Sequence, residues 1–232
     1  DHIEGGAADD IISLATGRVP LTATATTTDF DGDTATDSKE IELGGEIRFE
    51  DDNPSVVVSA TAEDEIVLTT QDAETDGVPT DDDTATTTAN FSGVFSAAPV
   101  YGADGAGSTT WAYSLDLKVA DGSDSGLNSQ GAAINLFDIG GTIVGSTAAA
   151  AGDVVAGNTV FTISVDNDGV VTLTQSQQVD HIEGGAADDI ISLATGLVTL
   201  TGTAPTTDFA GDTATDSTES DVGGKHRLAD DN

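Results

Sequence analysis

The stretch NTVFTISVDNDGVVTLTQ, residues 158–175, contains two runs in which apolar and polar side chains alternate. Between the runs stands Asn167-Asp168-Gly169, and an Asp-Gly pair flanked by alternating runs is a strong local signal for a tight β-hairpin. Strict alternation is also the period of a strand with one buried face. The stretch therefore predicts two paired strands over 158–166 and 169–175.

The rest of the chain repeats this pattern. Short runs rich in Val, Ile, Thr and Phe alternate with clusters of Gly, Asp and Asn, the composition of strands and turns. No run has the length and periodicity of an amphipathic helix, so the fold class is all-β. Further strands are expected at 18–28, 54–62, 65–71, 109–119, 132–139 and 141–147.

A long internal repeat organises the chain. Residues 1–53 return as residues 180–232, with 40 identical positions of 53 at an offset of 179. A period of this length suits an array of whole globular modules rather than a helical repeat or a propeller blade. The chain is therefore expected to hold one full period preceded by the tail of another, as a spacer, a stalk or a multivalent binder would.

The expected division into domains follows from the number of strands. About fourteen strands in one period exceed the seven to nine of a single sandwich, so two sandwich domains per period are expected. The predicted parts are 1–53 as the end of a preceding repeat, 54–157 as one sandwich, and 158–232 as a second. Residues 1–53 would then lack a hairpin of their own. They would either pair with a partner or belong to a split domain that shares strands with 158–232.

Composition excludes several classes of function. Lys plus Arg number 6 against 42 Asp plus Glu, which gives a formal net charge of −36. Self-repulsion of this size opposes compaction unless cations lie among the carboxylates. Nucleic acid and anionic membranes are excluded as partners because the cationic patch that they require is missing. Cys is absent, which leaves calcium as the expected cross-link of an extracellular fold.

The motif DFDGDTATD places four carboxylates around a glycine: Asp29, Asp31, Asp33 and Asp37 around Gly32. Calcium prefers oxygen ligands, and an Asp-rich turn supplies them. The second copy keeps Asp208, Asp212 and Asp216 but has Ala210 at the position of Asp31. The motif lacks the flanking helices and the twelfth-position Glu of an EF-hand. It is either a calcium site or an ordinary solvated hairpin turn.

The cluster Glu50, Asp51, Asp52 and Asn53 lies at the expected domain junction and is the stronger candidate. Neighbouring carboxylates repel unless a cation bridges them, and Glu63-Asp64-Glu65 could supply further oxygens. The alternative is a charged linker. The same argument applies more weakly to the acidic stretch 72–83.

The repeated segment GGAADDIIS, at 5–13 and 184–192, approximates a calcium-binding nonapeptide. A β-roll needs such units in immediate succession, and here single copies lie one period apart. We expect a turn that enters a strand, with Asp9 and Asp10 as possible metal ligands.

The sequence offers little for catalysis. Without Cys there is no Cys–His pair, and the three histidines form no constellation. Trp111 and Tyr113 could form a sugar-stacking platform, but they share one strand face with Leu115 and Leu117. The preferred interpretation places Trp111 in the core.

The order of several segments resembles the long repeats of giant bacterial adhesins exported by type I secretion, the RTX adhesins. The segments are TTWAYSLDLK (109–118), DSGLNS (124–129), VFTISVDNDGVVTLTQSQQVDH (160–181), LVTLTGTAPTTDFAGDTATDS (197–217) and FEDDNPS (49–55). The resemblance implies Ig-like Greek-key β-sandwiches in an extender region. It also implies calcium at the junctions, with ligands at Asp29, Asp33, Asp51 and Asp52. The second copy departs from this pattern, because His226 and Ala229 replace Ile47 and Glu50.

From these observations we expect a monomeric, non-catalytic spacer at the bacterial cell surface. Calcium would rigidify it, and neighbouring repeats of the same chain would be its partners. The sequence holds no apolar run long enough to cross a membrane. The alternative is an adhesive module that itself binds glycan or protein, which should carry exposed aromatic side chains.

Overall fold

The computed structural model describes residues 11–50, 52–61, 66–72, 85–181 and 190–229. These residues form strands joined by turns and short 3-10 helices, so the fold is all-β, as predicted. The chain divides into two compact units. Unit 1 comprises 1–55, 100–108 and 207–214, and unit 2 comprises 56–99, 109–206 and 215–232.

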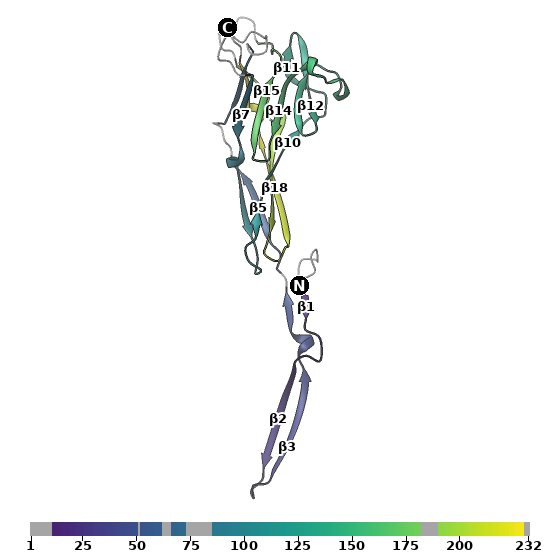
Figure 1. Cartoon of the computed structure of the whole chain (residues 1–232), viewed down its shortest axis with the longest axis vertical. Coiled ribbons are helices and arrows are strands. Elements are labelled where there is room, and N and C mark those ends of the chain that lie inside the picture. Colours follow the sequence, from purple (N-terminus) through teal and green to yellow (C-terminus); the bar gives the residue numbers. More distant parts are fainter. Residues whose placement is uncertain (1–10, 51, 62–65, 73–84, 182–189, 230–232) are drawn as a thin grey trace. The chain divides into compact units, whose positions relative to one another are not determined.

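The largest sheet of unit 2 has six strands in the order β11-β12-β13-β14-β15-β7 (Figure 1). Their bounds are β7 Thr86–Asn90, β11 Ser123–Ser129, β12 Ala132–Ile139, β13 Thr142–Ser146, β14 Thr159–Val165 and β15 Val170–Gln175. All neighbouring strands in it are antiparallel. The predicted hairpin is β14–β15, with Val165 opposite Val171. Its turn closes on the Asp166 carboxylate, which accepts hydrogen bonds from the backbone N–H groups of Asp168 and Val170, both at 2.9 Å.

A second sheet has the order β10-β17-β18, with β9 also paired to β17. Its strands are β9 Ser108–Thr109, β10 Ala112–Leu117, β17 Val198–Thr207 and β18 Thr213–Asp221. β10 lies against β12, β13 and β14 of the six-stranded sheet. The two sheets bury one core between them, in which Leu115 and Leu200 meet Ile134, Ile143 and Phe161. This arrangement is a β-sandwich.

Smaller sheets complete the fold. In unit 2, β19 (His226–Ala229) lies between β16 (Ile190–Ser192) and β6 (Leu68–Gln71). β5 (Ser55–Ala60) pairs with β8 (Phe95–Val100). In unit 1, β1 (Ile11–Ser13) pairs with β4 (Arg48–Glu50), and β2 (Pro20–Thr28) pairs with β3 (Thr34–Glu42). The 3-10 helices are η1 Gly44–Glu46, η3 Ser92–Val94, η4 Ala151–Asp153, η5 Ala156–Asn158 and η6 Gly223–Lys225.

The domain boundary predicted between residues 157 and 158 does not coincide with a break in the structure. β13 and β14 lie on either side of that position and pair directly, with Ile143 opposite Ile163. The six-stranded sheet is wider than a sheet of the expected small sandwich. It contains β7, β11, β12 and β13, which were predicted to lie in one domain, and β14 and β15, which were predicted to lie in the other.

Candidate cation site

The first acidic turn connects β2 to β3 and brings three carboxylates together. The backbone N–H of Asp33 donates to the Asp29 Oδ1 atom at 2.8 Å, and Gly32 makes the turn at a φ of 96°. Carboxylate oxygens of Asp29, Asp31 and Asp33 all lie within 4.8 Å of one another. Hydrogen bonding from the Asp31 carboxyl, and then from backbone N–H groups, lowers the pKa of Asp29 below its ordinary value. The alternating spacing in the sequence therefore does gather these residues, and all three are exposed.

The equivalent turn of the second copy has the same backbone but a different environment. The Asp208 Oδ1 atom accepts hydrogen bonds from the N–H groups of Gly211 at 2.8 Å and Asp212 at 2.9 Å. Asp208 is only 4% exposed. Its other oxygen, Oδ2, is buried and has no hydrogen-bond partner. One carboxylate oxygen at this turn is thus desolvated without compensation, which is unfavourable for an ionised group.

The loop 101–108, also in unit 1, covers this turn. The N–H of Phe209 donates to the carbonyl oxygen of Gly105 at 3.3 Å. Gly107 comes so close that a Cβ there would lie 2.0 Å from the carbonyl oxygen of Thr207, so only glycine fits. The loop carries Asp104, whose Oδ2 atom is also buried without a hydrogen-bond partner. Two uncompensated carboxylate oxygens therefore lie on hydrogen-bonded neighbouring segments.

Asp104 was not among the predicted ligands. The signal in the sequence is the Asp-Gly pair in YGADGAG at 101–107, which predicts a turn but does not indicate which other turn it contacts.

The junction cluster is only partly described. Asp52 is exposed, and its Oδ2 atom accepts a hydrogen bond from the N–H of Ala103 at 3.1 Å. Asn53 is exposed beside it, and Glu50 ends β4. Asp51 and Asp64 lie outside the described residues. Asp52 thus contacts the loop that carries Asp104, and the predicted donor segment 63–65 lies outside the described residues.

The remaining predicted ligands do not join a cluster in the described part of the chain. The Asp37 Oδ1 atom accepts a hydrogen bond from the neighbouring Ser38 N–H at 3.0 Å. Asp216, the equivalent residue in the second copy, accepts one from the Val58 N–H at 2.8 Å and so connects β18 to β5. Asp212 contributes its N–H to the Asp208 turn. Asp9 and Asp10 lie outside the described residues.

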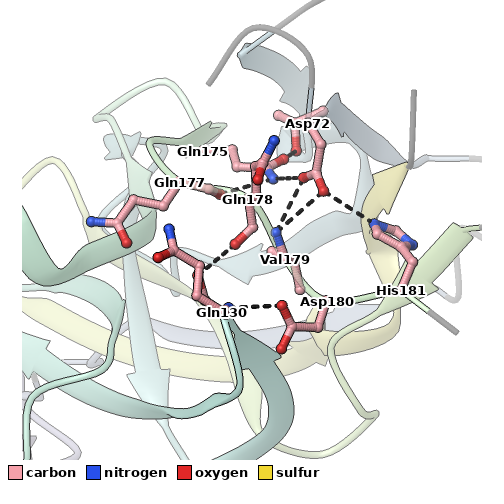
Figure 2. A network of polar contacts seen from close by, with 10 residues as sticks. Asp72, Gln130, Gln175, Gln177, Gln178, Val179, Asp180 and His181 are labelled. Atoms are coloured by element: carbon pink, nitrogen blue, oxygen red, sulfur yellow. Dashed lines mark hydrogen bonds and ion pairs between the residues drawn. The ribbon is translucent and has the colours of Figure 1, made fainter. Parts of the chain in front are cut away.

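A different acidic residue, Asp72, has a structural role within unit 2 (Figure 2). It is 7% exposed, and its carboxylate accepts hydrogen bonds from Gln175 Nε2 and from the Val179 N–H. His181 Nε2 lies 3.5 Å from its Oδ2 atom. Asp72 had been grouped with the acidic stretch 72–83. It is instead the acceptor that fastens segment 175–181 to the end of β6.

The aromatic cluster belongs to the core, as the shared strand face predicts. Trp111 and Tyr113 stack with ring centroids 6.0 Å apart and an interplanar angle of 8°. Phe95 lies 6.2 Å from Trp111. Both Trp111 and Tyr113 are partly buried against the main core. Burial, and then the charge of Asp168, raises the pKa of Tyr113.

Two sheets packed face to face around one core define an all-β sandwich protein. A family described as a domain of unknown function, DUF5801, matches residues 64–222, and the chain belongs to this family. No curated protein and no solved structure matches the chain. Among the described residues, no helix is long and apolar enough to cross a membrane.

Proposed function

We propose that the chain is a non-catalytic extender of a bacterial surface adhesin, in which bound calcium holds the loops of tandem Ig-like sandwiches. The observation that carries the proposal is the pair of buried, unpartnered oxygens, Oδ2 of Asp104 and Oδ2 of Asp208. They belong to a chain with a formal net charge of −36. Burial of an anionic oxygen without a donor or a cation is strongly unfavourable. A cation bound at this place removes the penalty.

Calcium suits these residues better than a transition metal does. It takes about six to eight oxygen ligands, and the chain has no Cys. Asp104 and Asp208 would hold the ion, and Asp52 contacts the same loop through Ala103. The exposed turn of Asp29, Asp31 and Asp33 offers a second, weaker position. When bound, calcium supplies a positive charge that loop and turn can share, so the two segments become fixed to each other.

A calcium requirement would let the chain be exported in a loose form. Extracellular calcium modules bind with dissociation constants of about 10⁻⁴–10⁻³ M. Sites of this affinity fill in a millimolar environment and stay empty in a calcium-poor cytosol. The spacer would then stiffen only outside the cell.

Calcium titration by calorimetry and thermal unfolding with and without EGTA test the proposal. At 100 times the dissociation constant, a ligand stabilises its site by about 2.7 kcal/mol. For a domain of this size the melting temperature should rise by about 5 °C or more. A melting temperature that is indifferent to both calcium and EGTA would refute the calcium part.

Matched variants locate the ion. Asp104→Asn and Asp208→Asn keep the side-chain shape and remove the charge, so each should lower calcium affinity at least tenfold. Asp153→Asn, which removes the same charge from an exposed position in η4, should leave affinity unchanged. If all three variants lowered calcium affinity equally, calcium affinity would depend only on the total charge of the chain, and the proposed site would be wrong.

One observation favours the adhesive alternative. Phe209 is 82% exposed and Phe30 is fully exposed, at equivalent positions of the two turns. Exposed aromatic rings on turns can stack on sugars or enter a protein surface. Binding on a glycan array that is lost in Phe209→Ala would support this second function.

A further inference from the structure

The two copies of the repeated segment have the same internal structure. In the first copy Ile12 pairs with Phe49 across β1–β4, and in the second the equivalent Ile191 pairs with Leu228 across β16–β19. A Cβ on Gly44 would lie 2.4 Å from the Ala15 carbonyl oxygen, and the equivalent distance at Gly223 is also 2.4 Å. The segment therefore adopts one conformation twice.

The copies differ in how much of their surface is covered. Leu21 of β2 is 52% exposed, whereas the identical Leu200 of β17 is fully buried. Phe49 of β4 is 53% exposed, and its counterpart Leu228 is 1% exposed. We call the surface of β2 and β4 that carries Leu21 and Phe49 the bare face. In the second copy the equivalent residues, Leu200 of β17 and Leu228 of β19, lie in the core.

The cover of the second copy comes from residues earlier in the same period. β10 pairs with β17, with Leu115 opposite Leu200. β6 pairs in parallel with β19, with Thr70 opposite Leu228. These two strands close the edges that remain open in the first copy, because among the described residues β2 pairs only with β3 and β4 only with β1.

Polar contacts fix this cover in register. The Thr201 hydroxyl donates to Asp116 Oδ2 at 2.6 Å. Lys118 Nζ lies 2.5 Å from Glu219 Oε1. The residues on the repeated side are unchanged in the first copy, where they are Thr22 and Glu40. There the Thr22 hydroxyl donates to Glu40 Oε2 at 3.5 Å.

From these contacts we propose that the bare face binds a second copy of this chain's own segment 56–118. The copy's equivalent of β10 would extend the sheet beside β2, and its equivalent of β6 would pair with β4. The folded module would then consist of residues 54–179 of one repeat and the 53 residues that follow. This inference depends on strand pairing and apolar burial, and it holds whether or not calcium binds.

One position sets the specificity of the contact. Gly202 lies against Phe95, and a Cβ there would be 2.6 Å from a ring carbon. The first copy has Ala23 at this place. An exact copy of the segment must therefore shift its Phe95 ring to fit, and Ala23→Gly should relieve the clash.

The test compares this chain with one extended at its N-terminus by a second copy of residues 54–179. Amide hydrogen exchange is measured on residues 20–28 and, as an internal reference, on residues 199–206. In the original chain residues 20–28 should exchange at least about 100-fold faster than the reference, because an isolated two-stranded hairpin is marginally stable. In the extended chain the exchange rate of residues 20–28 should fall to within about tenfold of the rate of the reference residues. Ala23→Gly should lower the rate further.

A Leu21→Asp variant supplies the control. In the extended chain it should abolish the new protection of residues 20–28 and leave residues 199–206 unchanged. In the original chain, where Leu21 is half-exposed, it should change little. The proposal is overturned if residues 20–28 exchange equally fast in the original, extended and Ala23→Gly chains. Failure of the added segment to fold gives this same refuting result, because the bare face is proposed to supply its missing strands.

Discussion

Replacement of His226 by Ile should make the stability of the chain less sensitive to acid. His226 lies in β19, is 1% exposed, and is opposite Leu68 of β6. Neither ring nitrogen has a hydrogen-bond partner in the described part of the chain. Burial lowers its pKa from 6.5 to about 4, although the backbone groups of Gly223 and Val222, and then the charge of Asp221, act in the opposite direction.

The magnitude follows from the difference between the folded and the unfolded pKa. The unfolded chain takes up the proton near pH 6.5, whereas the folded chain resists it until about pH 4. Because the folded pKa is depressed, stability is complete above pH 6.5 and falls as the pH drops toward 4. A pKa difference of this size corresponds to about 3 kcal/mol of unfolding free energy.

The assay is urea unfolding of the wild type and His226→Ile between pH 7.5 and pH 4, followed by the fluorescence of Trp111. Many carboxyl groups titrate in the same range, so the informative quantity is the difference in unfolding free energy between the two proteins. Isoleucine is the natural choice because the first copy has Ile47 at this position. The difference should grow by about 3 kcal/mol toward pH 4. A difference that does not change with pH would refute the reasoning.

Three further substitutions, two of them with a matched control variant, test the packing by chemical denaturation. Leu200→Ala should destabilise by about 2–5 kcal/mol, whereas Leu21→Ala, the same change on the bare face, should cost less than about 1 kcal/mol. Asp72→Ala should cost about 2–4 kcal/mol, because the Val179 N–H and Gln175 lose a buried acceptor. Gly145→Ala should cost about 1–3 kcal/mol, because its Cβ would lie 2.4 Å from the Phe161 ring. Gly157→Ala, with nothing within 4 Å of the new Cβ, is the control and should change little.

Most of the strands expected from the sequence have an apolar face; the Thr-rich β2 was expected as well, whereas the polar strands β7 and β18 were not. The alternation in 158–175 located β14 and β15 because every second side chain there enters the core. β18 and β7 consist mostly of Thr, Ala and charged residues. They form strands because β17 pairs with β18 and β15 pairs with β7. The local sequence pattern does not indicate which strand will pair with them. The sheet across residues 157 and 158 escaped prediction for the same reason.

Only part of the candidate site could likewise be predicted from the sequence. Asp29, Asp31 and Asp33 are close in sequence and lie in one turn, so their spacing alone predicted the cluster. Asp104 and Asp208 are far apart in sequence, and the segments that carry them are neighbours only because the N–H of Phe209 donates to Gly105 of the loop 101–108. The expected contribution of residues 63–65 to the junction stays a prediction, because these residues lie outside the described part of the chain. In the structure Ala103 contacts Asp52.

The equal conformation of the two copies has a genetic consequence. Recombination between the DNA segments that encode residues 11–53 and 190–232 removes or inserts one period of 179 residues. In the hybrid segment the equivalent of Ile12 would still lie opposite residue 49 or residue 228, because both copies form this pair. The length of the encoded protein would thus change in whole periods, and the strand pairing of the repeated segment would be kept.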